Sequence, residues 1–260
     1  MDLLKARSLV SRQPWVNYMV TLVIDFFSRA IQFFYDLSAM IGIPSYVIAI
    51  ALFTLAIKAI LFPMTKKQYV SMAQMQLIQP ELQKIQKKYK NNPEKQQQEM
   101  MALYQEYQVS PFASCLPLLI QMPILLALFT TLRGFFDPVS HPAYVNLDKA
   151  TFLGVSLGAT PSSIGFSAVS LLFPILVGLG TFVQQRVTMA RGGATPQGDG
   201  AGAQTQKIML YFMPIFIGYI SWKFPVGLCL YWIVYSFYGI IEQFLIRREP
   251  KVVKEAAGKK

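Results

Sequence analysis

The sequence is poor in the residues that bind metal ions or act as activated nucleophiles. Its 260 residues include one histidine, His141, and two cysteines, Cys115 and Cys229. The cysteines lie in separate apolar segments without metal-ligand spacing, so we interpret them as small core residues. A single histidine provides no ligand cluster. We therefore predict that the protein uses no metal ion and no other cofactor.

Catalytic motifs are also scarce. The phosphate-binding pattern G-x-x-x-x-G-K-[ST] does not occur, which argues against ATP-driven work. Residues 154–158 (GVSLG) match the nucleophile elbow G-x-S-x-G, but they lie in a predicted loop without a strand-to-helix context. His141 also precedes this serine, against the chain order of hydrolases that use the elbow. The sequence therefore predicts a protein that is not an enzyme.

Acidic residues are outnumbered, since 13 Asp and Glu face 24 Lys and Arg, for a net charge of +11. Seven of the basic residues fall in 66–110, three in 184–207 and six in 247–260, between or after long apolar runs. The chain is 53% hydrophobic, with a mean hydropathy of +0.39. This composition indicates an integral membrane protein, and the basic stretches are typical of cytoplasmic segments.

We predict an all-α integral membrane protein with five transmembrane helices. The spans are placed at 45–63, 112–133, 164–186, 207–222 and 228–246. The segments outside the bilayer are an exterior N-terminal region 1–44, a cytoplasmic helical hairpin 64–111, an exterior loop 134–163, a cytoplasmic linker 187–206, an exterior turn 223–227 and a basic cytoplasmic tail 247–260. The N-terminus then lies outside and the C-terminus in the cytoplasm, although the basic residues near the N-terminus argue mildly against this orientation.

Two segments outside the predicted spans have amphipathic patterns. Between residues 17 and 41, polar side chains recur at helical spacing, which favours a helix lying in the membrane interface, with a first span as the alternative. Gly42 and Pro44 should end this helix. In 65–110, two apolar seams flank a turn at 91–93 and predict a helical hairpin, or a merely solvated connector. The polar stripe is Asp25, Arg29, Gln32 and Asp36; the seams are Met75, Ile78, Leu82, Ile85 and Tyr89, then Met100, Leu103, Tyr104 and Tyr107.

Lys58 lies inside the apolar run 46–62, which is about 25 Å long as a helix. A lysine at the centre of a span costs about 2.5–3.5 kcal/mol on insertion scales, so its presence needs a reason. One explanation is that its stem carries the ammonium to the nearer interface, since Pro63 is five residues away. The other is that Lys58 faces a wet cavity between helices, on the same helical face as Thr54.

The fifth predicted span also has a polar face. Tyr231, Tyr235, Tyr238 and Glu242 recur at i, i+4, i+7 and i+11, either as aromatic packing or as the lining of a cavity. Glu242 and Lys58 lie at similar depth, so the two charges could approach each other. Further polar residues share faces of the second and third spans: Ser114, Gln121, Ser170 and Thr181. Together these faces predict a polar groove open to the cytoplasm.

The sequence resembles the YidC/Oxa/Alb family of membrane protein insertases from about residue 45 to 248. The matching stretches are 61–66 (LFPMTK), 79–82 (QPEL), 100–104 (MMALY), 117–124 (PLLIQMPI) and 224–232 (FPVGLCLYW). The resemblance implies a five-span core with an exterior amphipathic helix, a cytoplasmic hairpin and a hydrophilic groove in the inner leaflet. The family's groove usually carries an arginine where this chain has Lys58, which keeps the charge but loses the planar five-donor fork. We also expect the chain to lack the large periplasmic domain of some relatives.

The resemblance implies nascent membrane proteins as substrates and the bacterial cytoplasmic membrane as the location. It further implies contact with the ribosome or a targeting receptor through the hairpin and tail, and a Sec translocon is a candidate partner. A small-solute transporter or channel is the alternative function. Transporters often contain an internal repeat, which we do not find, and a cytoplasmic hairpin is unusual for a channel.

Overall fold

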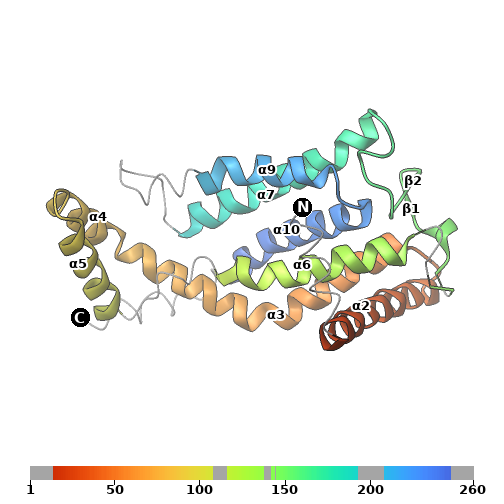
Figure 1. Cartoon of the computed structure of the whole chain (residues 1–260), viewed down its shortest axis with the longest axis horizontal. Helices are drawn as coiled ribbons and strands as arrows, with labels where there is room; N and C mark the ends of the chain where they lie inside the picture. Colours follow the sequence, from red (N-terminus) through yellow and green to blue (C-terminus); the bar gives the residue numbers. More distant parts are fainter. Residues whose placement is uncertain (1–13, 108–115, 138–141, 144, 193–207, 247–260) are drawn as a thin grey trace. The chain divides into compact units, whose positions relative to one another are not determined.

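The computed structural model describes residues 14–107, 116–137, 142–143, 145–192 and 208–246. The predicted site residue Ser114 and the basic tail 247–260 lie outside these residues, as does most of the linker. The described chain is helical apart from one two-stranded hairpin (Figure 1). Its elements are α2 (Pro14–Met40), α3 (Tyr46–Leu77), α4 (Gln79–Lys88), α5 (Pro93–Glu106), α6 (Leu116–Phe135), η2 (Leu147–Lys149), β1 (Thr151–Phe152), β2 (Val155–Ser156), α7 (Ala168–Gly192), η3 (Ile208–Phe212), α9 (Met213–Ser221) and α10 (Val226–Ile246).

Three segments of the described chain are long and apolar enough to cross a membrane, namely Tyr46–Ser71, Ala168–Ala190 and Val226–Ile246. A shorter apolar helical segment covers Ile208–Ser221. Large apolar side chains on these helices are exposed: Ile60, Ile175, Leu179, Ile215 and Phe237. Such a surface is explained by a bilayer, in which lipid tails cover it. The all-α membrane class is therefore confirmed, while the count of five spans stays a prediction.

The described chain divides into two compact units. The first contains the described parts of 1–54, 122–173 and 221–232. Its centre is Tyr46, which is fully buried, stacks on Tyr35 at 4.1 Å between ring centroids, and donates a 3.1 Å hydrogen bond to Gln32. The Tyr46 hydroxyl also accepts a 3.2 Å bond from the backbone N–H of Asn146. One aromatic residue thus ties α2 to the start of α3 and to the loop after α6.

The helix predicted over 17–41 is present as α2, and it ends where Gly42 adopts a φ of +82°. A positive φ suits glycine because it has no Cβ. The predicted exterior loop contains structure that the sequence did not indicate, a hairpin of β1 and β2 pairing Thr151 with Ser156. The backbone after β2 then holds the start of α10, because Gly227 donates to Leu157 and Val226 donates to Ala159.

The second unit contains the described parts of 55–121, 174–220 and 233–260. Within it, α7 and α9 approach closely through glycine. A Cβ at Gly178 would lie 3.2 Å from the Pro214 carbonyl oxygen, and one at Gly218 would lie 3.4 Å from the Gly178 Cα. Small residues at a helix interface allow backbones to pack this closely, which is how membrane helices commonly associate.

The second unit also contains a helical hairpin of α4 and α5, whose cytoplasmic position stays a prediction. Ile78, Leu82 and Leu103 form its buried core, with four flanking residues from the predicted seams: Ile85, Met100, Tyr104 and Tyr107. Asn92 caps α5 by accepting a 3.1 Å hydrogen bond from the Lys95 N–H. The predicted boundary between span and hairpin at 63/64 is not a helix end, because α3 continues through Pro63 to Leu77. The first arm of the hairpin therefore begins as an extension of the spanning helix.

Candidate functional site

The clearest polar feature of the second unit is an ion pair between α3 and α10. The Lys58 Nζ lies 3.3 Å from the Glu242 Oε2. The two residues are almost fully buried, with 3% of Lys58 and none of Glu242 exposed. The explanation in which Lys58 extends to the membrane interface is therefore wrong for this structure. The predicted approach of Lys58 to Glu242 is confirmed.

Aromatic rings complete the surroundings of the Lys58 ammonium. Its Nζ lies 3.7 Å from the centroid of the Tyr235 ring and 6.0 Å from that of Tyr238. Tyr235, Tyr238 and Glu242 come from one face of α10, because they are spaced by three and four residues. A ring face attracts a cation through its quadrupole, and the attraction grows when both groups are shielded from water. Three residues of α10 thus stabilise one charge of α3.

More polar side chains are buried near the same end of these helices. Gln243, which follows Glu242, donates a hydrogen bond to the Thr188 hydroxyl of α7. The Tyr69 side chain of α3 interacts with Gln243 and lies within electrostatic reach of Glu242. Tyr69 is eleven residues after Lys58, so both lie on one face of α3. This extension of the polar face was missed by the sequence analysis, although the eleven-residue spacing repeats that of Tyr231 and Glu242.

Helices of the second unit pack closely and also bury polar atoms. A Cβ at Gly180 would lie 3.3 Å from the Ser236 Cβ, and Gly239 lies directly against the Gln184 side chain. The Gln68 Nε2, the Ser236 Oγ and the Glu242 Oε1 are buried and have no hydrogen-bond partner among the described residues. Buried polar atoms without hydrogen-bond partners are costly, so each of these three is a point at which the packing is polar but incomplete.

The remaining predicted site residues are distributed over both units. Thr181 belongs to the second unit, where its hydroxyl donates a 2.8 Å bond to the Val177 carbonyl; Gln121 is half-buried there. Thr54, Ser170 and Tyr231 belong to the first unit. Thr54 donates to the Ile50 carbonyl at 2.6 Å, and Ser170 exchanges hydrogen bonds with Ser167 at the start of α7. Each of these hydroxyls therefore forms hydrogen bonds with backbone groups three or four residues away in its own segment. The structure thus brings together Lys58, Tyr235 and Glu242 of the predicted set.

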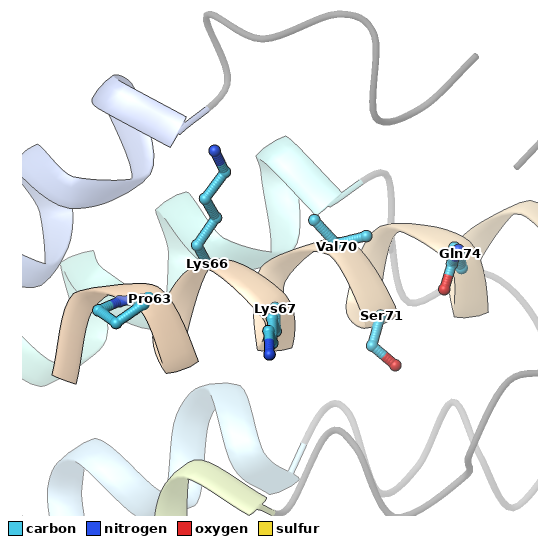
Figure 2. Close-up of a pocket in the computed structure, with 6 residues that line it drawn as sticks. All are labelled: Pro63, Lys66, Lys67, Val70, Ser71 and Gln74. Carbon is cyan, nitrogen blue, oxygen red and sulfur yellow. The ribbon is translucent and has the colours of Figure 1, made fainter. Parts of the chain in front are cut away.

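A cavity of about 430 Å³ lies further along α3, past the apolar run. It is lined by Pro63, Lys66, Lys67, Val70, Ser71 and Gln74 (Figure 2). Figure 2 shows the Lys66 side chain extending to one side of the helix and the Lys67 and Ser71 side chains to the other. The cavity is separate from the Lys58–Glu242 pair in its lining, and its two ammonium groups make it basic.

These features define a class of protein, a membrane protein of several apolar helices with a buried ion pair between two of them. The model of the 60Kd inner membrane protein family matches residues 36–255, which is most of the chain. A protein of Oceanobacillus iheyensis is 36% identical over 214 residues, covering 81% of this chain and 77% of the relative. One of Clostridium perfringens is 38% identical over 201 residues, covering 77% of this chain and 78% of the relative.

A third relative, from Endomicrobium trichonymphae, is 35% identical over 222 residues, which are 85% of this chain but 38% of the relative. Each of the three is named a membrane protein insertase YidC. The chain belongs to the 60Kd inner membrane protein family, and the expected YidC/Oxa/Alb resemblance is thereby confirmed. It is a bacterial membrane protein with several spans.

Proposed function

We propose that this chain inserts segments of nascent membrane proteins into the bilayer. The observation that carries the proposal is the buried Lys58–Glu242 pair between two apolar helices, in a chain whose relatives are named insertases. Membrane helices rarely carry ionisable residues, and those that do usually line a polar path. The pair, its aromatic neighbours and Gln243 form a buried polar cluster of this kind.

This polar cluster lowers the cost of moving a hydrophilic tail into the bilayer. A polar group that enters hydrocarbon loses its hydrogen bonds to water, which costs about 2–7 kcal/mol for each unsatisfied uncharged group and far more for a charge. Side chains of α3, α7 and α10 can replace part of that solvation, while apolar substrate segments partition into lipid. No covalent step is needed. The predicted groove residues Gln121 and Thr181, together with Ser114, belong to this proposal.

The orientation and the partners are proposed in the same way. The hairpin, the linker and the tail carry most of the basic charge, so we place them in the cytoplasm and the N-terminus outside. A basic hairpin and tail are suited to ribosomal RNA or an acidic targeting receptor, since such contacts rest on charge. Contact with a Sec translocon is proposed from the resemblance alone.

The test is insertion into vesicles that contain only the purified chain. A single-span substrate with a short hydrophilic tail is synthesised in their presence, and protease protection of the tail measures translocation. Protection well above that in empty vesicles is expected. A solute-leakage assay on the same vesicles provides the comparison with a channel: tail protection without leakage supports an insertase, and leakage without protection contradicts it.

A further inference from the structure

The ammonium of Lys58 already has a carboxylate partner before any substrate arrives. Glu242 occupies the position that an acidic substrate side chain would need, at 3.3 Å from Nζ. The enclosure of the pair, with 3% and 0% exposure, leaves little room for a second carboxylate beside the first. An acidic group can therefore reach Lys58 only if Glu242 leaves.

The details of the pair fit an exchangeable contact better than a permanent one. The Lys58 ammonium donates its hydrogen bond to the Oε2 of Glu242, and the Oε1 is buried without a hydrogen-bond partner among the described residues. A buried ion pair stabilises a protein when its remaining lone pairs are satisfied and its geometry is good. Only one of the two Glu242 carboxylate oxygens is hydrogen-bonded within the described chain, so the pair is weaker than one in which every polar atom has a partner.

Tyr235 lets the lysine stay in place during such an exchange. Its ring centroid lies 3.7 Å from Nζ, so the ammonium keeps a favourable contact when the carboxylate departs. Tyr235 and Glu242 are both on α10, seven residues apart, and they approach Lys58 from the same helix. The Lys58 charge is therefore stabilised by the Glu242 carboxylate and by tyrosine rings, and of these only the carboxylate competes with a substrate carboxylate.

We propose that Glu242 competes with substrate carboxylates for Lys58. Acidic side chains of an entering segment must displace Glu242 from this ammonium. The inference rests on the proposed insertase function and adds a specificity-determining residue to it. One ammonium–carboxylate contact is broken and one is formed, so the number of paired charges is unchanged. Neutral tails cannot make this exchange, and Glu242 thus sets how strongly the site prefers acidic over neutral segments.

The experiment measures binding apart from insertion. A fluorescent single-span peptide with two Asp in its tail is titrated against the full chain in detergent micelles, and a matched peptide with Asn in their place is titrated in parallel. The readout is the ratio of the two dissociation constants. The variants are Glu242→Gln, Glu242→Asp and Lys58→Gln/Glu242→Gln, with Glu94→Gln as a control that removes one exposed negative charge from the start of α5.

Removing the competitor should raise the preference for the acidic peptide about tenfold, a typical size for coupling between groups that share a site. Glu242→Asp, which keeps the charge on a shorter stem, should give a smaller rise in the same direction, and it serves where Glu242→Gln does not fold. The double variant should show no preference, and Glu94→Gln should match the wild type. Glu242→Gln keeps the Lys58 charge and the double variant removes it. A preference for the acidic peptide in the first variant and not in the second identifies the pair as the cause.

A merely structural tie between α3 and α10 predicts something different. Glu242→Gln and Glu242→Asp would then weaken both peptides equally or leave both unchanged, and that result would overturn the competitor role. The vesicle assay tests the proposed function separately from this binding ratio. Failure of vesicles with the wild-type chain to insert any substrate would contradict the proposed function. A normal vesicle assay with an unchanged binding ratio would contradict Glu242 alone.

Discussion

Lys58 and Glu242 are 184 residues apart in the chain, and their charged atoms lie 3.3 Å apart between α3 and α10. The contact cancels the two charges inside segments that otherwise contain almost only apolar side chains. It also means that the predicted positive groove charge is paired in this structure. Any role for Lys58 in attracting acidic segments must therefore include the departure of Glu242.

The first prediction concerns the stability of the pair. Lys58→Ala or Glu242→Ala should each lower the free energy of unfolding by about 3–5 kcal/mol, because each leaves one buried charge without a partner. Lys58→Met/Glu242→Leu should lie close to the wild type, since no charge remains in the span. Thermal unfolding in detergent measures all three, and Glu99→Ala on the hairpin controls for the loss of a distant carboxylate. Single variants as stable as the wild type would show that the pair is solvated.

The second prediction concerns the glycine contact between α7 and α9. Gly178→Leu should destabilise the protein by about 1–3 kcal/mol, because its Cβ would begin 3.2 Å from the Pro214 carbonyl and the rest of the side chain would force the helices apart. Gly134→Leu on α6 is the matched control, since a Cβ there meets nothing within 4 Å. Unfolding in detergent compares the two. Equal effects at both positions would mean that the close approach is not needed for stability.

The sequence predicted correctly those features that depend on helical periodicity. The i, i+4, i+7, i+11 face of the fifth span led to Glu242, and the depth of Lys58 led to its partner. The hairpin core of Ile78, Leu82 and Leu103 followed from the two apolar seams predicted on either side of the turn. Such patterns are local, and each residue's face is fixed by its number within the helix.

Features that depend on tertiary context were not predictable. The helix through Pro63 runs against the usual helix-breaking effect of proline, which removes one N–H donor but is tolerated in membrane helices because neighbouring groups satisfy the freed carbonyl. The short β-hairpin after Ala150 lacks the alternating pattern that identifies longer strands. Thr54 and Tyr231 share helical faces with Lys58 and Glu242, yet each belongs to the other compact unit.

The third prediction concerns the hairpin. Leu103→Ala should destabilise α4 and α5 by about 2–5 kcal/mol, because Leu103 is buried in the hairpin core at 8% exposure. The adjacent Met101→Ala is the control, since 46% of Met101 is exposed. Amide hydrogen exchange of residues 79–106 reports the loss of protection. Faster exchange in both variants to the same extent would argue against a packed core.

The fourth prediction concerns the basic cavity on α3. Lys66→Gln/Lys67→Gln should reduce the stabilisation that anionic phospholipid gives over neutral phospholipid, because each lysine near a membrane surface contributes about 1 kcal/mol of attraction. The melting temperature in mixed micelles with and without phosphatidylglycerol measures this difference. Lys149→Gln, in the predicted exterior loop, removes an exposed charge elsewhere and should leave the difference unchanged. An unaltered difference in the double variant would exclude these two lysines from lipid contact.

The last prediction concerns orientation, for which the charge distribution is the argument. In a background without Cys115 and Cys229, a cysteine at position 91 should resist a membrane-impermeant reagent in intact cells and react after lysis. Asn91 is exposed in the hairpin turn and, unlike Asn92, does not cap α5, so its replacement leaves the helix start intact. Thr151→Cys, exposed on β1, should react from outside and verifies that the reagent reaches the surface. In the reverse labelling pattern, position 91 reacts from outside and position 151 does not, which requires seven basic residues in 66–110 to cross the membrane. That pattern would overturn both the orientation and the cytoplasmic access proposed for Lys58.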